Sequence, residues 1–362
     1  MPSVSRNRRC LTPAAFAAGA LALTLAAPTA LAEETAIGFV THAQGNPFVE
    51  QIVDGAKAAA SDLGVALKVE ESPGGSPENQ LKLAQGLVNA GANGIASSMP
   101  GDAMAKGMND IIASGVPVVQ FNILSTAVKA PYVGERSTQS GRILGKMVLD
   151  KLGGASAKGK VVIGNCFPGF PVLENRAKGV EESLKAAPGL SVLGPFDVKV
   201  SAVENYNHWE QLYAANPDTV AMIGLCAPDI ASLGKLNAAN GDKFIAGGYD
   251  LTAENLAAIK DKHAYVSLGQ SPFVQGYLPV VLLDEAIKAK KPLPVGFYDA
   301  GTQIVTADSV TMGNGLPNVT FDQLQKLAAD PKATAEFYKP WIKSVTNAAT
   351  PPAMQPIEAE SQ

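Results

Sequence analysis

The chain has 362 residues, of which 46% are hydrophobic and 17% are charged, and its formal net charge is −4. This length and hydrophobic content predict two domains, each with a substantial buried core. The acidic balance argues against a nucleic-acid partner, because binding to phosphates would require a basic surface.

The first 32 residues have the organisation of a secretory signal peptide. Arg6, Arg8 and Arg9 precede an apolar stretch over Ala14–Ala27, and the segment ends in Ala30-Leu31-Ala32. The apolar stretch is shorter than the ~20 residues that a membrane span needs, and small residues at its end are typical of a cleavage site. Cleavage after residue 32 would leave 26 basic and 33 acidic residues, a net charge of −7. We therefore expect an exported, soluble mature protein.

Short apolar strands alternate with helices along the next part of the chain. The predicted strands cover residues 36–40, 66–70, 94–98 and 116–121, with helices over 47–63 and 77–90 and a third ending near residue 113. The strands are continuously apolar, as expected for parallel strands that are buried on both faces of a sheet. This alternation predicts β-α-β units.

The same alternation begins again after residue 160. Strands are predicted over 160–165, 191–196, 220–225, 244–247 and 265–268, and helices over 172–186, 203–215, 227–239 and 253–260. A helix over 273–289 and a strand near 295–304 then return the chain to the first half. The predicted fold is α/β, with two open parallel-sheet lobes joined by three hinge strands near Glu135, Gln270 and Gly301.

This organisation predicts the division of the whole chain. The signal peptide is 1–32, the N-terminal lobe is 33–135 plus 271–301, the C-terminal lobe is 136–270 plus 302–312, and a C-terminal extension covers 313–362. Within the extension, helices are predicted over 321–329 and 334–344. The polar, proline-containing end over 348–362 is predicted to be disordered.

Polar and aromatic residues gather in the loops that follow the predicted strands. In open parallel sheets ligands bind beyond the carboxyl ends of the strands, and two facing sheets would bring both sets of loops into one cleft. The residues predicted to contact a ligand there are His42, Gln44, Asn46, Phe48, Asn122, Phe170, Arg176, Asp229, Asp250 and Gln270. Amides, an arginine and carboxylates can form paired hydrogen bonds with adjacent hydroxyls, and aromatic faces can cover a sugar ring. The set suits a small polyhydroxylated ligand, although Asp and Asn also cap helices after strands.

The sequence carries no recognisable catalytic or cofactor motif. It has no G-x-S-x-G, no H-E-x-x-H and no G-x-x-x-x-G-K-[ST] segment. His42 is alone in the predicted cleft, where a hydrogen-bonding role is more common than metal binding. We therefore expect a binding protein with no cofactor and no metal, and not an enzyme.

Several segments are similar to a known family. They are Asn46-Pro47-Phe48 at the start of a helix, Gly115–Val119, Glu174–Gly179, Gly248-Tyr249-Asp250 and Gly269–Pro272. Together they resemble the periplasmic sugar-binding proteins of ABC transporters, of the ribose-binding-like type I family. The resemblance implies that Asn46, Arg176, Asp250 and Gln270 bond sugar hydroxyls and that Phe48 stacks on the sugar ring.

The sequence departs from the ribose-binding pattern at three places. Asn122 and Ile123 stand where the family often has Asp-Arg, and an isoleucine cannot replace the arginine as a hydrogen-bond donor. Val49 stands where ribose-binding members have a second aromatic residue, and the segment before Asp229 lacks the family's Asn-Asp. These departures argue against simple ribose binding.

The resemblance implies a monomeric solute-binding component of an ABC importer, located in the periplasm. It would bind a small sugar or polyol by hinge closure and deliver it to an inner-membrane permease, and a chemoreceptor as second partner stays open. Alternative ligands are a nucleoside or a furanosyl signal molecule. A less favoured alternative is an exported sugar-modifying enzyme that uses Asp250 and Asp229. A LacI-type repressor shares the fold but would begin with a basic helix-turn-helix.

Cys166 and Cys226 are the two cysteines that remain after processing. In the strand order typical of the family, the strands that end at these residues are neighbours. Adjacent strands lie ~4.8 Å apart, and a disulfide needs Cα atoms within roughly 4.4–6.8 Å. An oxidising compartment favours a disulfide at the cleft wall, and the alternative is two buried free thiols.

Overall fold

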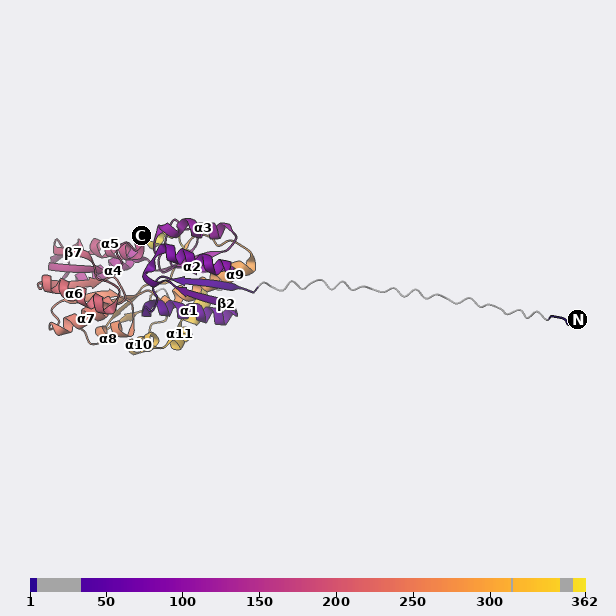
Figure 1. Ribbon diagram of the computed structural model, residues 1–362. Coiled ribbons are helices and arrows are strands. Elements are labelled where there is room, and N and C mark those ends of the chain that lie inside the picture. The colour runs from indigo at the N-terminus through magenta and orange to yellow at the C-terminus, as the bar shows by residue number, and fades with distance from the viewer. Residues whose placement is uncertain (5–33, 314, 346–353) are drawn as a thin grey trace. The chain divides into compact units, whose positions relative to one another are not determined.

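Two sheets organise the protein, and each carries one lobe (Figure 1). The computed structural model describes residues 1–4, 34–313, 315–345 and 354–362, and residues 34–362 form one compact unit. From residue 5 on, the predicted signal peptide lies outside the described residues. In the described part of the chain, no helix is both long and apolar enough to cross a membrane.

The N-terminal lobe is built on a six-stranded parallel sheet. Its order is β11 (Phe297–Asp299), β5 (Tyr132–Gly134), β4 (Val118–Phe121), β3 (Gly94–Ser97), β1 (Ala36–Thr41) and β2 (Ala66–Glu71). Helices α1 (Pro47–Leu63) and α9 (Pro272–Ala289) cover one face, and α2 (Pro77–Asn89) and α3 (Ala105–Ala113) cover the other. Successive β1 residues serve the two faces, since Phe39 packs in the core with Ile52 of α1 and Val40 packs in a separate core with Leu87 of α2.

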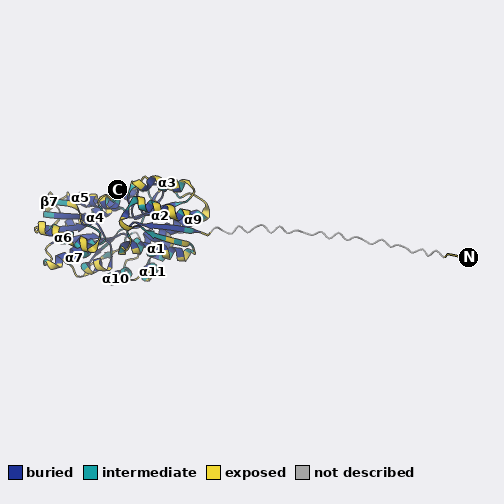
Figure 2. Ribbon diagram, in the orientation of Figure 1, coloured by how far each residue is buried: buried dark blue, intermediate teal, exposed yellow. Residues whose placement is uncertain are grey.

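The C-terminal lobe is built on a seven-stranded sheet. Its order is β13 (Val310–Thr311), β12 (Gln303–Thr306), β10 (Val266–Gly269), β9 (Ile245–Tyr249), β8 (Thr219–Gly224), β6 (Lys158–Asn165) and β7 (Gly189–Asp197). Its helices are α4 (Ser137–Lys151), α5 (Pro171–Leu184), α6 (Ala202–Ala215), α7 (Asp229–Ala239) and α8 (Ala253–Lys260). Strands β12 and β13 are antiparallel to their neighbours and the others are parallel. The central strands are buried, whereas the edge strands β2, β7 and β13 are partly exposed (Figure 2), and the predicted α/β fold with two lobes is confirmed.

The structure differs from the predicted elements at the edges of the lobes. The strand predicted over 295–304 is two strands, β11 in one sheet and β12 in the other, because the chain changes lobe near Gly301, whose φ is 84°. Strand β5 and helix α4 were not predicted. A three-residue strand shows no periodicity, and the α4 sequence is rich in small residues that weaken a helical pattern.

The chain passes between the lobes three times, after β5, after β10 and after β11. Beside these crossings, two helix pairs approach so closely that glycine is required. A Cβ atom at Gly276 of α9 would lie 1.8 Å from the Ile52 carbonyl oxygen of α1, and one at Gly179 of α5 would lie 2.1 Å from the Thr138 carbonyl oxygen of α4. These pairs therefore pack backbone against backbone next to the crossings.

The C-terminal extension contacts both lobes through two helices, α10 (Phe321–Ala329) and α11 (Pro331–Val345). Helix α10 lies on α8, where Lys260 Nζ is 3.3 Å from an Asp322 carboxylate oxygen. Helix α11 lies on α1 and α9, where the Tyr338 ring stacks on Phe273 with centroids 5.7 Å apart. The extension therefore joins helices of different lobes.

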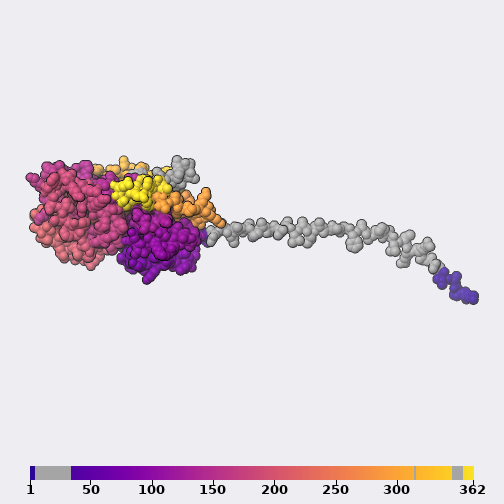
Figure 3. Space-filling model, turned by 90° about the horizontal axis from the view of Figure 1, so that it is seen from above, coloured from indigo at the N-terminus to yellow at the C-terminus, as the bar shows by residue number. Residues whose placement is uncertain are grey.

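The last nine residues are ordered against the molecule, although the sequence predicts disorder over 348–362; residues 346–353 lie outside the described residues. Gln355 forms two backbone hydrogen bonds with Phe297 of β11, and Ala359 packs with Leu124 and Tyr132. The order comes from pairing with an edge strand, which leaves no local sequence pattern. Figure 3 shows these residues in yellow, between the purple N-terminal lobe and the magenta part of the chain.

Glu360 attaches this tail, the segment over residues 354–362, to the C-terminal lobe. Its side chain accepts a hydrogen bond from Ser137, and its second oxygen lies 3.1 Å from Asn175 Nδ2. Burial raises the pKa of the Glu360 carboxyl to about 7, and the charge of Glu135 adds to the effect, while the bonds from Ser137 and Asn175 and the charge of Arg176 oppose it. Between the ordinary pKa of 4.5 and about pH 7, the docked tail therefore holds a proton that the free tail would release.

We predict that the tail docks more firmly as the pH falls from about 7 to about 5. The docked pKa is raised above its ordinary value, so the stabilisation is fully present at low pH and is lost as the pH rises through about 7. Hydrogen exchange of the tail amides, corrected for intrinsic rates, measures this. Glu360→Gln should remove the pH dependence and Glu358→Gln, at an exposed neighbour, should keep it. Equal protection across this range in the wild type would contradict the prediction.

Candidate ligand-binding site

Strand ends from both lobes surround a cavity of about 60 Å³. Most of the residues that the sequence predicts as ligand contacts line it: His42, Asn46, Phe48, Asn122, Phe170, Arg176, Asp250 and Gln270. Two predicted contacts, Gln44 and Asp229, do not. The topology therefore brings together polar side chains that lie far apart in the sequence, and we call this cavity the inner pocket.

Arg176 of α5 is held in place by protein groups on several sides. Its Nε donates to Glu135 Oε1 at 2.5 Å, Nη2 contacts the same oxygen, and Nη1 donates to the Leu225 carbonyl at 2.7 Å. The guanidinium lies 3.8 Å from the ring centroid of Tyr249, whose hydroxyl is 3.0 Å from that of Ser140. Arg176 is 3% exposed and Glu135 is fully buried. The charged side chain is thus pre-positioned at the pocket wall, where part of it stays available to a ligand.

A chain of hydrogen bonds connects the two lobes across the pocket floor. Asp250 Oδ1 accepts from Gln270 Nε2 at 2.9 Å, and Gln270 Oε1 accepts from Asn122 Nδ2 at 3.2 Å. Asn122 Nδ2 also donates to Gln275 of α9 at 3.1 Å. In the described part of the chain, Asp250 Oδ2 and Asn122 Oδ1 accept no hydrogen bond from the protein. These two oxygens are therefore ready to accept ligand hydroxyls.

Asp250 and Asn122 both have left-handed backbone conformations, with φ of 71° and 59°. Asp and Asn are the non-glycine residues that adopt this conformation most readily, so the residue types match the turns as well as the chemistry. Burial raises the pKa of the Asp250 carboxyl to about 6, while Arg176 and the bond from Gln270 act in the opposite direction. Asp250 is therefore ionised at neutral pH and protonated in mild acid.

His42 presents a neutral imidazole to the pocket. Its Nδ1 is 3.2 Å from the Ser98 hydroxyl, and burial lowers its pKa to about 4. The ring is nearly perpendicular to that of Phe170, with centroids 6.2 Å apart, and Phe170 stacks on Phe167 at 4.6 Å. His42 can therefore bond a hydroxyl, and the two phenylalanines supply an apolar face.

Three predicted ligand contacts differ from the prediction. Asn46 has a second role, and Gln44 and Asp229 lie outside the inner pocket. Asn46 caps α1, since its Oδ1 accepts from the Phe48 amide at 3.0 Å, and it still borders the pocket. Gln44 is exposed and lines a larger outer cavity. Asp229 is fully buried, and its oxygens accept from Asn205, from the Trp209 ring N–H at 2.9 Å and from the Cys226 amide. It serves the packing of the C-terminal lobe, and we leave it out of the proposed ligand set.

Cys166 and Cys226 form a disulfide in the structure, with Cα atoms 6.1 Å apart. They follow β6 and β8, which are parallel neighbours, as the strand order typical of the family implies. Both sulfur-bearing residues line the inner pocket beside Val172 and Leu173. This wall of the pocket is apolar, in contrast to the polar floor.

Two residues that shape the pocket were not predicted as part of it. Glu135 appears in the sequence only as a hinge position and Gln275 as one residue of an apolar helix, whereas Tyr249 is among the aromatic residues that the sequence predicts in the cleft loops. The sequence signal that could have identified such residues is a polar residue isolated in an apolar segment. A single amide on the buried face of α9, or a single carboxylate after a buried strand, must meet a partner inside the protein.

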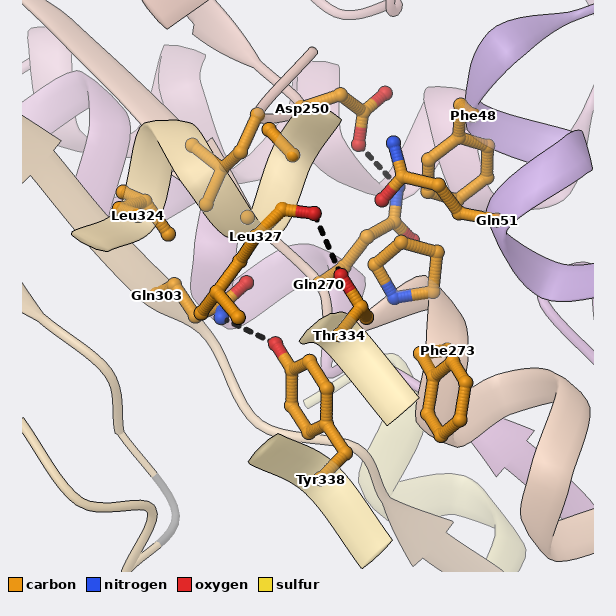
Figure 4. A pocket seen from close by; sticks show the side chains of 14 residues that line it. Phe48, Gln51, Asp250, Gln270, Phe273, Gln303, Leu324, Leu327, Thr334 and Tyr338 are labelled. Atoms are coloured by element: carbon orange, nitrogen blue, oxygen red, sulfur yellow. Dashed lines mark hydrogen bonds between the residues drawn. The ribbon is translucent and has the colours of Figure 1, made fainter. Parts of the chain in front are cut away.

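The C-terminal helices close one side of the site (Figure 4). A second cavity of about 30 Å³ shares Phe48, Asp250 and Gln270 with the inner pocket and is bounded on its other side by residues of α10 and α11. There Gln303 Nε2 donates to the Tyr338 hydroxyl at 2.8 Å. Among the described residues, no group of three or more His, Cys, Asp or Glu side chains could hold a metal ion.

Residues 37–291 match the model of the periplasmic binding protein domain family. The chain belongs to this family. The extension beyond residue 313 and the tail lie outside the matched residues. The resemblance of the Asn46, Arg176 and Asp250 segments is thereby confirmed at the level of the family.

Named relatives of this family are binding proteins for sugars. The chain is 24% identical to the xylose/arabinose-binding protein XylF of Sulfolobus acidocaldarius, over 68% of this chain and 65% of the relative. It is 26% identical to the ribose import binding protein RbsB of Haemophilus influenzae, over 75% of this chain and 92% of the relative. The first alignment thus spans slightly less than two thirds of XylF.

Solved structures share the fold. A solute-binding protein from Burkholderia graminis, solved in complex with D-arabinose, superposes with a TM-score of 0.72 at 22% identity, over 76% of this chain and 96% of that one. The glucose-galactose binding protein GanP of Geobacillus stearothermophilus superposes with a TM-score of 0.69 at 20% identity, over 76% and 99%. At this identity the likeness supports the two-lobe fold and not a particular ligand.

We predict that Glu135 and Arg176 stabilise the protein only as a pair. Arg176→Met should lower the free energy of unfolding by about 3–5 kcal/mol, because it leaves a carboxylate buried and unpaired, and Glu135→Gln should act similarly. The double substitution should cost clearly less than the sum of the two. Urea unfolding of the ligand-free variants measures the coupling.

The half-exposed pair Arg142–Glu182, with side chains 37% and 34% exposed, joins α4 to α5 and is the control for an ion pair at the surface. Its coupling should be much smaller than that of Glu135 and Arg176, because solvent screens an exposed ion pair. Simple additivity for Glu135 and Arg176 would contradict the prediction.

Proposed function

We propose that this protein is the solute-binding component of an ABC importer, and that it binds a small sugar or polyol in the inner pocket and delivers it to a permease. The observation that carries the proposal is the hydrogen-bonded floor, in which Asp250, Gln270 and Asn122 join the two lobes directly beneath the pocket. A ligand bound there would contact both lobes at once. Binding and the relative position of the lobes would therefore be coupled.

The chemistry of the pocket favours a ligand with adjacent hydroxyl groups. The carboxylate of Asp250 and the carbonyl of Asn122 each have an oxygen free to accept, and Arg176 can donate. Hydrogen bonds to charged groups are worth about 1.5–3 kcal/mol each, which exceeds an average neutral bond. Phe48 and Phe170 offer rings to the C–H faces of the ligand. The sugar-binding relatives support the same ligand class.

The pocket supports binding without turnover. The only hydroxyl bonded to His42 in the described structure is that of Ser98, which is fully buried, does not line the pocket and also accepts from Gln80 at 3.0 Å. That pair therefore cannot attack a bound sugar. Glycosidases usually use two carboxyl groups, but among the described residues Asp250 is the one carboxyl that lines the pocket, and Asp229 is occupied by packing contacts outside it. We infer that the protein is a receptor and not a sugar-modifying enzyme.

Location and partners follow from the same proposal. The signal-peptide pattern over residues 1–32 would send the protein to the periplasm, where it would work as a monomer and meet an inner-membrane permease. Ile123 borders the inner pocket at the position where an arginine would serve a more hydroxylated sugar. Because isoleucine cannot replace that arginine as a donor, the alternative ligand is a nucleoside or a furanosyl signal molecule.

We predict one ligand per chain, recovered unchanged. The protein over residues 33–362 would be titrated by calorimetry with a panel of pentoses, hexoses, polyols and nucleosides. Mass spectrometry would then analyse the recovered ligand. Binding of a sugar at one site without chemical change supports the proposal. A panel without a single sugar or polyol ligand, or a ligand altered by the pure protein, would count against it.

We predict that affinity falls in mild acid because Asp250 becomes protonated. Its pKa is about 6 in the free protein, and a hydroxyl that donates to the charged carboxylate lowers that pKa. Below about pH 6 binding must therefore release a proton, and the affinity should drop roughly tenfold per pH unit. Calorimetry at several pH values measures the slope.

Two variants identify the group that titrates. Asp250→Asn should bind weakly at every pH and show no slope. Asp229→Asn removes a carboxyl whose pKa burial also raises to about 6, but which lies outside the pocket, so the slope should remain. A slope that disappears with Asp229→Asn and persists with Asp250→Asn would show that the pocket carboxylate is assigned incorrectly.

A further inference from the structure

We propose that the ligand is a glycoside, in which the sugar ring is joined through its anomeric carbon to a second ring, and that a separate groove binds this second ring. The inference rests on the proposed function, since it assumes a sugar in the inner pocket. It adds a second subsite and therefore a substrate class.

The groove is continuous with the inner pocket and much larger. Its volume is about 510 Å³, against about 60 Å³ for the inner pocket. The two share five lining residues: Ala43, Asn46, Phe167, Val200 and Ala227. The inner pocket is much smaller than the about 300–1,000 Å³ usual for small-molecule sites. A sugar ring held by Asp250 would therefore already reach the groove, and most of the groove would stay unfilled.

The groove persists although the lobes already touch beside it. The Phe170 ring of the C-terminal lobe packs against the N-terminal lobe, where a Cβ atom at Gly75 would lie only 2.7 Å from its Cζ atom. The same ring lies nearly perpendicular to the His42 ring, with centroids 6.2 Å apart. Because these contacts are made, the groove is not simply a gap between separated lobes.

Short side chains create the space of the groove, and two features of its lining suit the second ring of the ligand. The C-terminal lobe lines the groove with residues such as Ala202 and Ala231, at the start of α6 and α7. Phe167 borders both cavities, and its ring, stacked on Phe170, can pack against a flat ligand group. Ser232 is 6% exposed, lines the groove, and its hydroxyl has no hydrogen-bond partner among the described residues.

The lining defines the chemistry of the second ring. Val200, Pro228 and Phe167 provide apolar contacts, and Ser232 can bond one polar atom on the ring. An aryl glycoside, a disaccharide and a nucleoside all have this form, with a ring of apolar faces attached at the anomeric carbon. The polar floor would recognise the sugar in each case.

Calorimetry on matched pairs tests the inference. The probes are D-xylose against xylobiose and 4-nitrophenyl β-D-xyloside, D-ribose against adenosine and uridine, and D-glucose against its phenyl β-glucoside. At least one glycoside should bind about tenfold or more tightly than its parent sugar, because the groove buries additional apolar surface. The pair that shows this gain identifies the source of the second ring.

Variants of the groove locate the second ring. Ala231→Phe and, on an exposed wall position, Ala202→Phe should abolish the gain while leaving the affinity for the parent sugar within about threefold. Ala231→Ser is the matched control and should retain the gain. Using both phenylalanine variants guards against misfolding of either one.

The outcomes separate the two proposals. If free sugars bind tightly and every glycoside binds more weakly, the second subsite is overturned and the proposed function stands. A gain that survives both phenylalanine variants also overturns the subsite. If neither sugars nor glycosides bind, the proposed function itself fails.

Discussion

The buried ion pair between Glu135 and Arg176 is the constraint on which the site depends. Taking two charges out of water is costly unless each meets the other and satisfies its remaining hydrogen-bonding groups. Here the carboxylate stands at the first crossing between the lobes and the guanidinium on α5, with the Leu225 carbonyl and the Tyr249 ring completing the environment. The pair thus links the crossing to the ends of β8 and β9, where the pocket residues follow.

The layout of the two sheets was predictable because buried parallel strands keep continuous apolar runs between amphipathic helices. The elements that were not predicted are short, or they are held by residues distant in the sequence. Strand β5 has three residues, and α4 carries the glycines that let it pack closely on α5, so neither shows a clear pattern. The tail is ordered by pairing with β11, which is distant in sequence. Such order depends on a partner that the segment itself does not encode.

The candidate site was largely predictable because the carboxyl ends of parallel strands meet at one edge. That rule predicts where the loops lie, but it does not predict which way their side chains point. Asp229 has the expected position after β8 but turns inward, because the ring N–H of Trp209 and the Asn205 amide need an acceptor in the core. Glu135 was missed for the complementary reason, since its partner Arg176 lies 41 residues away. Both cases depend on burial, which a local pattern cannot show.

The inner pocket and the groove would contribute to binding in different ways. One hydrogen bond to the Asp250 carboxylate is worth about 1.5–3 kcal/mol, and it requires a hydroxyl in one position. A second ring that buries about half of the ~150–250 Å² typical of an aromatic group would gain about 2–3 kcal/mol at ~25 cal/mol per Å². The gains are similar, but apolar contact is non-directional and tolerates many rings. The polar floor would therefore determine which sugar binds, and the groove would determine how tightly its glycosides are held.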